Sequence, residues 1–334
     1  MKKNRFLAAV SAAVIALTGL TACSAEQTAD DGKLKIGVIQ LVSHPSLDNC
    51  YAGIEQGLMA SSYADKIEID LQNGNGESTN CDAIAKNMAA KNYDMIFAIA
   101  TPAAQSAYGA VQNSDTPVIF CAVSDPVAAG LTVSLDAGTE KCIGTSDVLD
   151  FDAQIELIKA LQPDVKKIGV LYTTTEANSL SHLKSFREIA EKSGIEVIDQ
   201  GVSTAADIPQ AAASLASKVD CINNFTDNNV VNNLSIVLEK ANAAGVPVYG
   251  SEVEQVKNGC IASMSIDYVA LGVATAELGV KVLDGTSPAD MAVGTISDAT
   301  PVVNTDVMTS FGFELPAQYE NAEKVTTNTD EAAE

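Results

Sequence analysis

Two stretches of the chain repeat the same alternation of apolar and polar segments. In each stretch, a short apolar run is followed by a polar loop and then by a segment with amphipathic, helical spacing. The apolar runs occur in the same order in both stretches, at 34–40, 93–100 and 116–120 in the first and at 165–172, 219–225 and 246–249 in the second. This recurrence predicts a duplicated α/β unit.

The segments between the apolar runs have the spacing of helices, and several end at a stop signal such as Pro163, Gly194 or Gly245. Strands that are apolar along their whole length are typical of parallel sheets covered by helices on both faces. We therefore expect two α/β lobes, each a doubly wound parallel sheet, with a ligand site beyond the carboxyl ends of the strands. Helices are expected at 48–61, 79–91, 103–112, 152–161, 181–193, 207–218, 230–244 and 268–283.

The N-terminus has the pattern of an export signal. Three basic residues within the first five precede an apolar run at 6–20, which is too short for a comfortable membrane span. Small residues then lead to Cys23, as in the bacterial lipobox, in which the cysteine thiol is lipidated. An ordinary signal peptide with a chance cysteine is the alternative. We expect a signal peptide at 1–22, a lipidated tether at 23–32, and an extracytoplasmic body anchored to the bacterial membrane by lipid.

The charge of the chain argues against two classes of partner. The formal net charge is −23, and removal of the three basic residues in the predicted signal peptide would bring it to −26. Nucleic acid is not an expected partner, because its phosphates require a basic footprint. Electrostatic adhesion to anionic lipid is equally disfavoured. The acidity indicates a well-solvated surface, with a cationic ligand as the alternative.

The sequence predicts neither a metal site nor an enzyme. Only two histidines are present and no cysteines form a CxxC pair, so we expect no metal ligands and assign no disulfide. Cys121, Cys221 and Cys260 fall inside strand-like runs rather than at strand ends, where a nucleophile would stand. Nucleophile-elbow, dinucleotide-binding and phosphate-loop motifs are absent. We therefore expect no catalysis and no cofactor.

The loops after the predicted strands carry a family resemblance. The matching motifs, in chain order, are His44-Pro45-Ser46-Leu47-Asp48, Ala100-Thr101-Pro102-Ala103-Ala104-Gln105, Val123-Ser124-Asp125-Pro126 with Ala129-Gly130, Glu176-Ala177-Asn178-Ser179, Thr226-Asp227-Asn228, Gly250-Ser251-Glu252, and Asp267-Tyr268 with Leu271-Gly272. In order and spacing they resemble the solute-binding lipoproteins of ABC importers with a type I periplasmic-binding fold, particularly the tryptophan/tyrosine-type branch. The resemblance covers about 33–312.

This resemblance implies a monomeric clamp that captures an amino acid, an aromatic one in the tryptophan/tyrosine-type branch, and delivers it to a membrane permease and its ATPase. It implies one lobe formed by 33–144 with 268–290 and another formed by 145–267 with 291–316, joined by a hinge of three crossings. A ligand that contacts both lobes would favour the closed arrangement. The acidic tail at 317–334 is poor in apolar residues and is expected to be disordered.

Two loops have the chemistry to hold the charged groups of an amino acid. Thr101 to Gln105, with Ala103 and Ala104 between them, open a predicted helix whose free N–H groups and dipole suit a carboxylate. Plain N-capping by the same residues is the alternative. Asp125 follows a strand and precedes a proline, where its carboxylate can pair with an ammonium group or form a turn.

The other candidates also follow strands. Asn178 and Ser179 reach the ligand or cap a helix that begins at Ser181, and Asp227 makes its loop better suited to a cationic or hydroxyl group than to an anion. His182 is expected at the surface. The full set of candidate ligand contacts is Ser43, His44, Thr101, Ala103, Ala104, Gln105, Asp125, Asn178, Ser179, Thr226, Asp227, Asn228, Ser251, Glu252 and Asp267.

Two alternatives to amino acid import remain at this stage. A lipoprotein that senses its ligand for a membrane receptor needs the same clamp and the same anchor as one that delivers it. A sugar or nucleoside is the alternative ligand. The chain has no tryptophan, on which sugar rings usually stack, and this disfavours a sugar.

Overall fold

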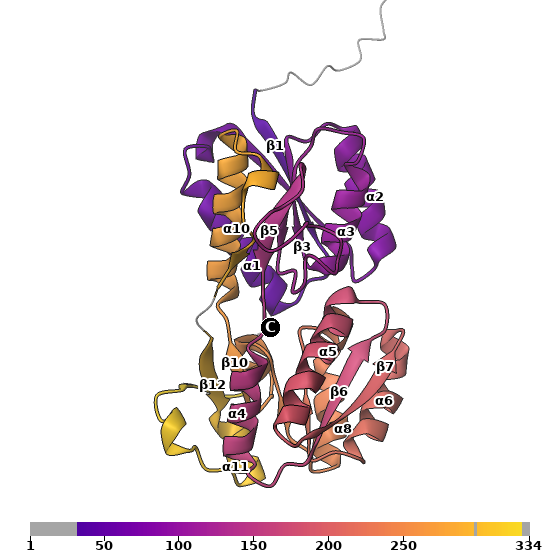
Figure 1. The fold of residues 1–334 in the computed structure, drawn as a ribbon, viewed down its shortest axis with the longest axis vertical. Coiled ribbons are helices and arrows are strands. Elements are labelled where there is room, and N and C mark those ends of the chain that lie inside the picture. The colour runs from indigo at the N-terminus through magenta and orange to yellow at the C-terminus, as the bar shows by residue number, and fades with distance from the viewer. Residues whose placement is uncertain (1–31, 297–298, 329–334) are drawn as a thin grey trace, which may run out of the picture. The chain divides into compact units, whose positions relative to one another are not determined.

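The computed structural model describes residues 32–296 and 299–328. The predicted signal peptide and the predicted lipidation residue Cys23 lie outside these residues, as does the end of the tail. From Leu34 onward the chain forms two lobes, each built on a parallel sheet (Figure 1). Within the described ranges, no helix is both long enough and apolar enough to cross a bilayer.

The first lobe is a six-stranded parallel sheet with the order β2-β1-β3-β4-β5-β11. Helices α1 and α10 lie side by side on one face, and α2 and α3 cover the other (Figure 1). The strands are β1 (Leu34–Gln40), β2 (Ile67–Asn73), β3 (Met95–Ile99), β4 (Val118–Cys121), β5 (Cys142–Ser146) and β11 (Gly294–Thr295), and the helices are α1 (Pro45–Met59), α2 (Ser78–Ala90), α3 (Thr101–Ala110) and α10 (Tyr268–Leu283).

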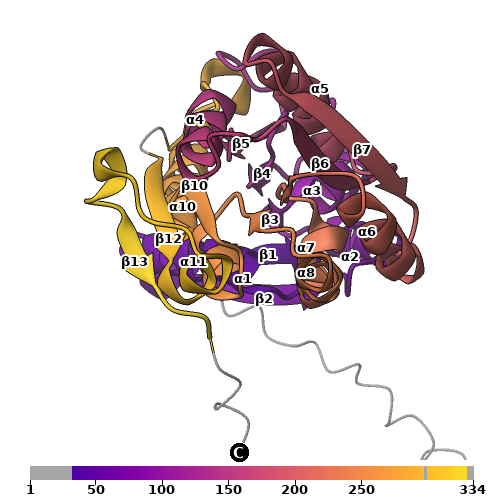
Figure 2. The same cartoon turned by 90° about the horizontal axis from the view of Figure 1, so that it is seen from below.

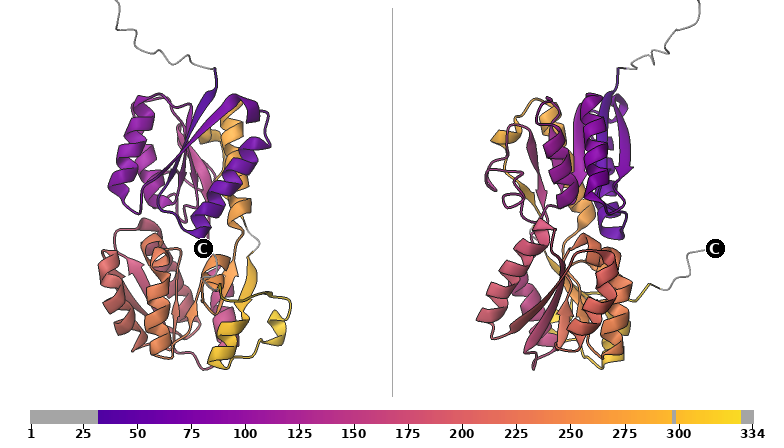
Figure 3. Two further views of the ribbon diagram at one scale, coloured as in Figure 1. Left: turned by 180° about the vertical axis from the view of Figure 1, so that it is seen from behind. Right: turned by 90° about the vertical axis from the view of Figure 1, so that its right-hand side faces the viewer.

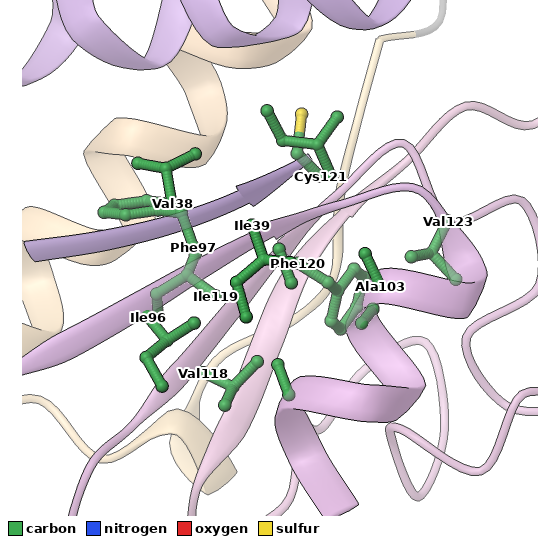
Figure 4. Close-up of a cluster of buried hydrophobic side chains, with 14 of the residues drawn as sticks. Val38, Ile39, Ile96, Phe97, Ala103, Val118, Ile119, Phe120, Cys121 and Val123 are labelled. Atoms are coloured by element: carbon green, nitrogen blue, oxygen red, sulfur yellow. The ribbon is translucent and has the colours of Figure 1, made fainter. Parts of the chain in front are cut away.

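Helices on both faces explain why the central strands are apolar throughout. Every residue of β3 and β4 is buried, and Phe97 and Phe120 are among the largest side chains that are fully enclosed. Figure 4 shows these rings and their aliphatic neighbours on both sides of the sheet. Burial of such side chains contributes about 1.5–3 kcal/mol each, so this core is the main source of the lobe's stability.

The second lobe contains a four-stranded parallel sheet, β7-β6-β8-β9, and a three-stranded mixed sheet, β10-β12-β13. Helices α4 and α5 lie on one side of the parallel sheet, and α6 and α8 lie on the other (Figure 2). The strands are β6 (Lys167–Thr173), β7 (Glu196–Val202), β8 (Cys221–Asn223), β9 (Val248–Tyr249), β10 (Ala262–Ser265), β12 (Thr300–Asn304) and β13 (Glu323–Val325). The helices are α4 (Phe151–Leu161), α5 (Ala177–Lys192), α6 (Ile208–Ala216), α7 (Asn228–Asn232), α8 (Leu234–Ala243), α9 (Val253–Lys257) and α11 (Thr305–Phe311), and short 3-10 helices occur at Ala64–Lys66, Ala205–Asp207, Pro288–Asp290 and Ala317–Tyr319.

The duplicated unit predicted from the sequence is confirmed by the strand order. The order β2-β1-β3-β4 in the first lobe matches β7-β6-β8-β9 in the second, and all of these pairs are parallel. The chain passes between the lobes after β5, between β10 and α10, and after β11 (Figure 3). β11, which the expected lobe boundaries assigned to the second lobe, pairs with β5 in the first.

The structure corrects several expected boundaries. The helix expected at 230–244 is two helices, α7 and α8, separated at Asn233. Helix α5 begins four residues before the expected Ser181, so Asn178 and Ser179 lie in its first turn. Cys260 lies just before β10 instead of inside a strand. All six cysteines among the described residues are buried and carry free thiols.

The structure also corrects the expectation of a disordered tail from Ala317 onward. Ala317–Tyr319 forms a 3-10 turn, and β13 adds to the edge of the mixed sheet by pairing in parallel with β12. Ala322, between these two elements, is buried. The polar composition of this segment predicts only that it is well solvated. Its order comes from the backbone pairing of β13 with β12, which composition does not reveal.

Helices α1 and α10 approach so closely that only glycine fits at the contact. A Cβ added to Gly53 would lie 2.1 Å from the backbone oxygen of Val269, and one added to Gly272 would lie 2.2 Å from the backbone oxygen of Cys50. Backbone atoms cannot rotate away as side chains can. A larger residue at either position would therefore force the two helices apart.

Replacing Gly53 by Ala is expected to lower the free energy of unfolding by about 2–3 kcal/mol, because the helices must separate. Gly109→Ala is the matched control, since Gly109 lies inside α3 and its Cβ would meet nothing within 4 Å. There, alanine's higher helix propensity predicts a gain of up to about 1 kcal/mol. Thermal and urea unfolding of both variants measures the difference, and equal stability would contradict the close approach.

Candidate functional site

A small pocket, called the cavity below, lies between the two lobes. Its walls come from loops that directly follow β1, β3, β4 and β5 in the first lobe and β6, β8 and β9 in the second. Ligands in parallel α/β sheets bind at this edge, beyond the carboxyl ends of the strands. The lining residues are His44, Ser46, Leu47, Thr101, Ala122, Ser124, Asp147, Asn178, Thr226, Asn228, Val231, Glu252, Gln255 and Tyr268.

The backbone is strained where β3 and β4 reach this cavity. Ala100 has φ 80° and ψ 153°, a region that is almost restricted to glycine, and Ala122 has φ 56°. Each such residue costs on the order of 1–3 kcal/mol. The strain redirects the chain sharply at the end of each strand, so that Thr101 begins α3 and Ser124 faces the cavity.

Several polar atoms that line the cavity have no hydrogen-bond partner within the described structure. They are Oγ1 of Thr101, Oδ1 of Asn178, Oγ1 of Thr226 and both ring nitrogens of His44. Burial lowers the pKa of His44 to about 4, so its imidazole is neutral, and the side chain of Asn228 faces it from the other lobe. Buried polar groups are nearly always paired in native proteins. Unpaired groups from both lobes around one cavity indicate a polar ligand.

Two carboxyl groups also face the cavity without a basic partner. Asp147 accepts hydrogen bonds from Ser124 Oγ at 2.8 Å and from the Tyr268 hydroxyl at 2.9 Å, and burial raises its pKa to about 6. Glu252 caps α9 through the backbone N–H groups of Glu254 and Gln255, and burial raises its pKa to about 7.

Both carboxyl groups act on the hydroxyl of Tyr268. The negative charges of both Asp147 and Glu252 contribute to raising the pKa of Tyr268, after its burial. No lysine or arginine lines the cavity, and none of the ion pairs within the described ranges involves either acid. The described residues contain no cluster of three or more metal-ligating side chains.

A second pair of acids supports the cavity wall of the second lobe from behind. Asp227 caps α7 and accepts from Ser179 Oγ at 2.7 Å and Thr173 Oγ1 at 2.8 Å. Glu176 accepts from Asn228 Nδ2 at 2.7 Å and from Asn178 Nδ2 at 3.1 Å. Burial, together with the charge of Asp227, raises the pKa of Glu176 to about 7. This network fixes the two asparagine side chains that line the cavity.

The structure brings six of the fifteen candidate contacts to the cavity. These are His44, Thr101, Asn178, Thr226, Asn228 and Glu252. Each follows the end of a strand in its own lobe, as the sequence predicted. The side chains of Asn178 and Asn228 both donate hydrogen bonds to Glu176, an interaction that the sequence did not indicate.

The structure places the other nine candidates away from the cavity. Ala103 and Ala104 are buried in the first core, and Gln105 donates to the backbone of Ala129. Asp267 caps α10. The remaining hydroxyl and carboxyl groups bond to protein partners: Ser43 to Asp48, Asp125 to Ser181, Ser179 and Asp227 to each other, and Ser251 to the backbone oxygen of Asn224.

Sequence reasoning did not name several lining residues as contacts. They are Ser46, Leu47, Ala122, Ser124, Asp147, Val231 and Gln255. A signal existed for Asp147, because it directly follows the segment that forms β5, near the expected boundary between the lobes. Leu47 and Val231 lie on helices one turn beyond the strand-end loops, where apolar residues usually indicate core.

His182 is buried, which corrects the expectation of a surface residue. It lies on α5, 5% exposed, with its ring 5.5 Å from those of Phe151 and Phe225. Burial lowers its pKa to about 4. The imidazole belongs to an aromatic cluster of the second core and does not line the cavity.

Comparison with known proteins agrees with this geometry. Residues 35–325 match the family described as ABC transporter substrate binding protein. A "Tyrosine-binding protein" of Clostridioides difficile (strain R20291) is 38% identical over 320 residues, which cover 92% of each chain. These relationships span both lobes.

Solved structures of two relatives have the same fold. An ABC domain from Streptococcus pneumonia in complex with L-Trp is 37% identical, with a TM-score of 0.85 over 88% of this chain and 99% of that one. A ligand-free, open substrate-binding protein with adhesive properties from Clostridium difficile is 38% identical, with a TM-score of 0.68 over 88% and 100%. The chain is thus a member of the family of ABC transporter substrate-binding proteins, with two α/β lobes of the periplasmic-binding type.

Proposed function

We propose that this protein captures an aromatic L-amino acid in the cavity between its lobes and delivers it to an ABC permease and its ATPase. One observation carries the proposal. The cavity contains two buried carboxyl groups without a basic partner and a set of unpaired neutral polar atoms from both lobes. A zwitterion satisfies both features, because its ammonium group complements the acids and its carboxylate accepts from neutral donors.

Each end of the ligand has its own partners in this proposal. The ammonium group binds between Asp147 and Glu252, next to Tyr268. The carboxylate binds at the N-terminus of α3, a ten-residue helix that begins at Thr101, whose unpaired hydroxyl lines the same cavity. Leu47, Val231 and the Tyr268 ring supply apolar surface for a side chain.

The relatives support the choice of an aromatic side chain. One is a tyrosine-binding protein, and another has L-Trp bound, at 38% and 37% identity. The two solved relatives are equally similar in sequence, yet the TM-score is 0.85 to the complex and 0.68 to the open, ligand-free form. This difference supports the interpretation that the lobes of this structure are in the closed arrangement.

The proposal includes an anchor outside the described residues. Members of this family act outside the cytoplasm, and the lipobox pattern at Cys23 supports attachment of the body to the membrane through a lipidated cysteine. A polar tether at 24–32 would leave the lobes free to open and close. Recovery of a Cys23→Ser variant in the membrane fraction would contradict the anchor.

A thermal-shift and calorimetric screen of the twenty amino acids tests the ligand. L-tyrosine or L-tryptophan is expected to raise Tm by several degrees at 100 times its Kd, since binding then contributes about 2.7 kcal/mol. The matched probe is 3-(4-hydroxyphenyl)propionate, which is tyrosine without its ammonium group and should bind at least 100-fold more weakly. A Tm shift with a sugar or nucleoside but with no amino acid would overturn the proposal.

A further inference from the structure

Outside the cavity, one side-chain hydrogen bond connects the two lobes directly. Ser181 Oγ, on α5 of the second lobe, donates to Asp125 Oδ2, on the loop after β4 of the first lobe, at 2.6 Å. Such a short contact between a hydroxyl and a carboxylate is a charge-assisted bond, about twice as strong as a neutral one. Neither residue lines the cavity.

The carboxylate is held in place by its own lobe. Oδ1 of Asp125 accepts from the backbone N–H of Ala128 at 2.9 Å, which fixes the side chain in the turn that contains it. The backbone bond from Ala129 N–H to the Asp125 carbonyl closes the turn, and Gln105 of α3 ties the turn to the first lobe by donating to the Ala129 carbonyl. Only Oδ2 is left to reach across to the other lobe, so the bond to Ser181 does not compete with local structure.

On the opposite side of the contact, Ser181 occupies the second turn of α5, and both residues are only partly buried. When the lobes separate, each group can exchange its partner for water. The bond therefore exists in the closed state and is absent in the open state. An interaction made in only one of two states shifts the equilibrium toward that state.

We propose that Asp125 and Ser181 form a latch that slows ligand release by stabilising the closed state without contacting the ligand. The inference rests on the proposed function, because it assigns a control of residence time to the same cavity. It also gives Asp125 a different role from the ammonium partner expected from the sequence. A latch of this kind acts on the rate of opening, whereas the cavity residues decide which ligand binds.

Stopped-flow measurement of binding and release tests the latch, with L-tyrosine and L-tryptophan as probes. Ser181→Ala is expected to increase koff on the order of tenfold while changing kon by less than about twofold. The ratio of the two affinities should stay the same, since the cavity is intact. Ser181→Thr keeps the hydroxyl and should restore a slow koff. Ser185→Ala, an exposed serine one turn further along α5, is the matched control.

A double-mutant cycle separates the latch from two independent local effects. Asp125→Ala together with Ser181→Ala should release ligand no faster than the faster single variant, because either change alone breaks the bond. Rates that multiply would overturn the latch. An unchanged koff in Ser181→Ala, or a changed affinity ratio, would also overturn it. If the wild-type protein bound neither amino acid, the proposed function would fail while the contact itself could still be tested.

Cross-linking tests the contact without reference to the ligand's identity. A chain with Asp125→Cys and Ser181→Cys is treated with a short bismaleimide, with and without L-tyrosine, and the linked peptides are identified by mass spectrometry. The six native cysteines of the body are buried, which limits side reactions. A link between positions 125 and 181 supports the contact in solution. Its absence under both conditions would overturn the latch even if amino acids bind.

Discussion

Replacing Asp147 by Asn is expected to weaken the binding of L-tyrosine or L-tryptophan by about 100-fold or more. Asparagine has the same shape and can keep one hydrogen bond with Ser124 or Tyr268, so the cavity should survive the change. The negative charge, however, is lost. An ammonium group left without a counter-charge in a buried site costs about 2–5 kcal/mol. Isothermal titration calorimetry of the wild type and the variant measures the loss.

Asp267→Asn is the matched control for this prediction. Asp267 lies next to Tyr268 in the passage between β10 and α10, but it caps α10 through Val269 and Ala270 and does not line the cavity. Asparagine caps a helix as well as aspartate does, so affinity should change less than about twofold. Equal losses in Asp147→Asn and Asp267→Asn would show that the passage, and not the charge in the cavity, had been disturbed.

The ligand without an ammonium group completes the test. The wild-type protein should prefer tyrosine to 3-(4-hydroxyphenyl)propionate strongly, and Asp147→Asn should lose much of that preference. Glu252→Gln is expected to show a similar but smaller effect, because two backbone N–H groups from α9 already offset part of its charge. A preference that is equally strong in all three proteins would contradict the assignment of the ammonium group to these acids.

Lowering the pH from 8 to 5 is expected to weaken amino acid binding by at least tenfold. Burial raises the pKa of Asp147 to about 6 and that of Glu252 to about 7, so both acids are ionised at pH 8 and largely protonated at pH 5. The ammonium group binds the ionised forms, and at low pH those protons must be displaced. His44 stays neutral over this range, since burial lowers its pKa to about 4.

In the ligand-free protein, the contribution of these acids to folding stability decreases as pH rises, whereas the affinity for ligand increases. The folded-state pKa values of Asp147 and Glu252 lie above their unfolded values, so these groups contribute stability below about pH 4 that is lost as pH rises through 6 and 7. The ligand-induced increase in Tm should therefore be larger at pH 8 than at pH 5. Calorimetry in two buffers of different ionisation enthalpy counts the protons released, and an affinity that is constant from pH 5 to 8 would contradict the mechanism.

Glu176 provides the control for this pH dependence. Its pKa is also raised to about 7, yet it lies behind the cavity wall and does not line the cavity. Glu176→Gln should keep the dependence of affinity on pH. Asp147→Asn should remove the contribution of Asp147 to that dependence, which is expected near pH 6. A dependence that disappeared in Glu176→Gln would assign the titration to the supporting network instead.

The sequence predicted the fold more fully than the cavity because the two depend on interactions of different range. Apolar runs such as those containing Phe97 and Phe120 are local and already indicate buried parallel strands. The position of Thr101 or Thr226 on the cavity follows from strand ends alone. Whether a polar side chain faces a ligand or a neighbour depends on contacts between distant segments. The sequence alone therefore does not distinguish Asp125 and Asp227, which bond to serine hydroxyls, from the two acids that line the cavity, Asp147 and Glu252.

The packing of α1 against α10 is another feature that the sequence alone did not predict. Helical spacing predicted both elements, and α10 has the expected bounds, but the glycine contact at Gly53 and Gly272 joins segments more than two hundred residues apart. His182 was expected at the surface because it lies beside Ser181 on a predicted helix. Its partners, Phe151 and Phe225, come from other elements.

The contact between α1 and α10 also sets the order in which the protein can complete its fold. The first lobe begins at Leu34, yet the helix that covers one face of its sheet ends only at Leu283, after the whole parallel sheet of the second lobe. A growing chain must leave the part of that apolar face that lies beside α1 uncovered until α10 has been made. The first lobe therefore completes its fold only after the chain of the second lobe has been made.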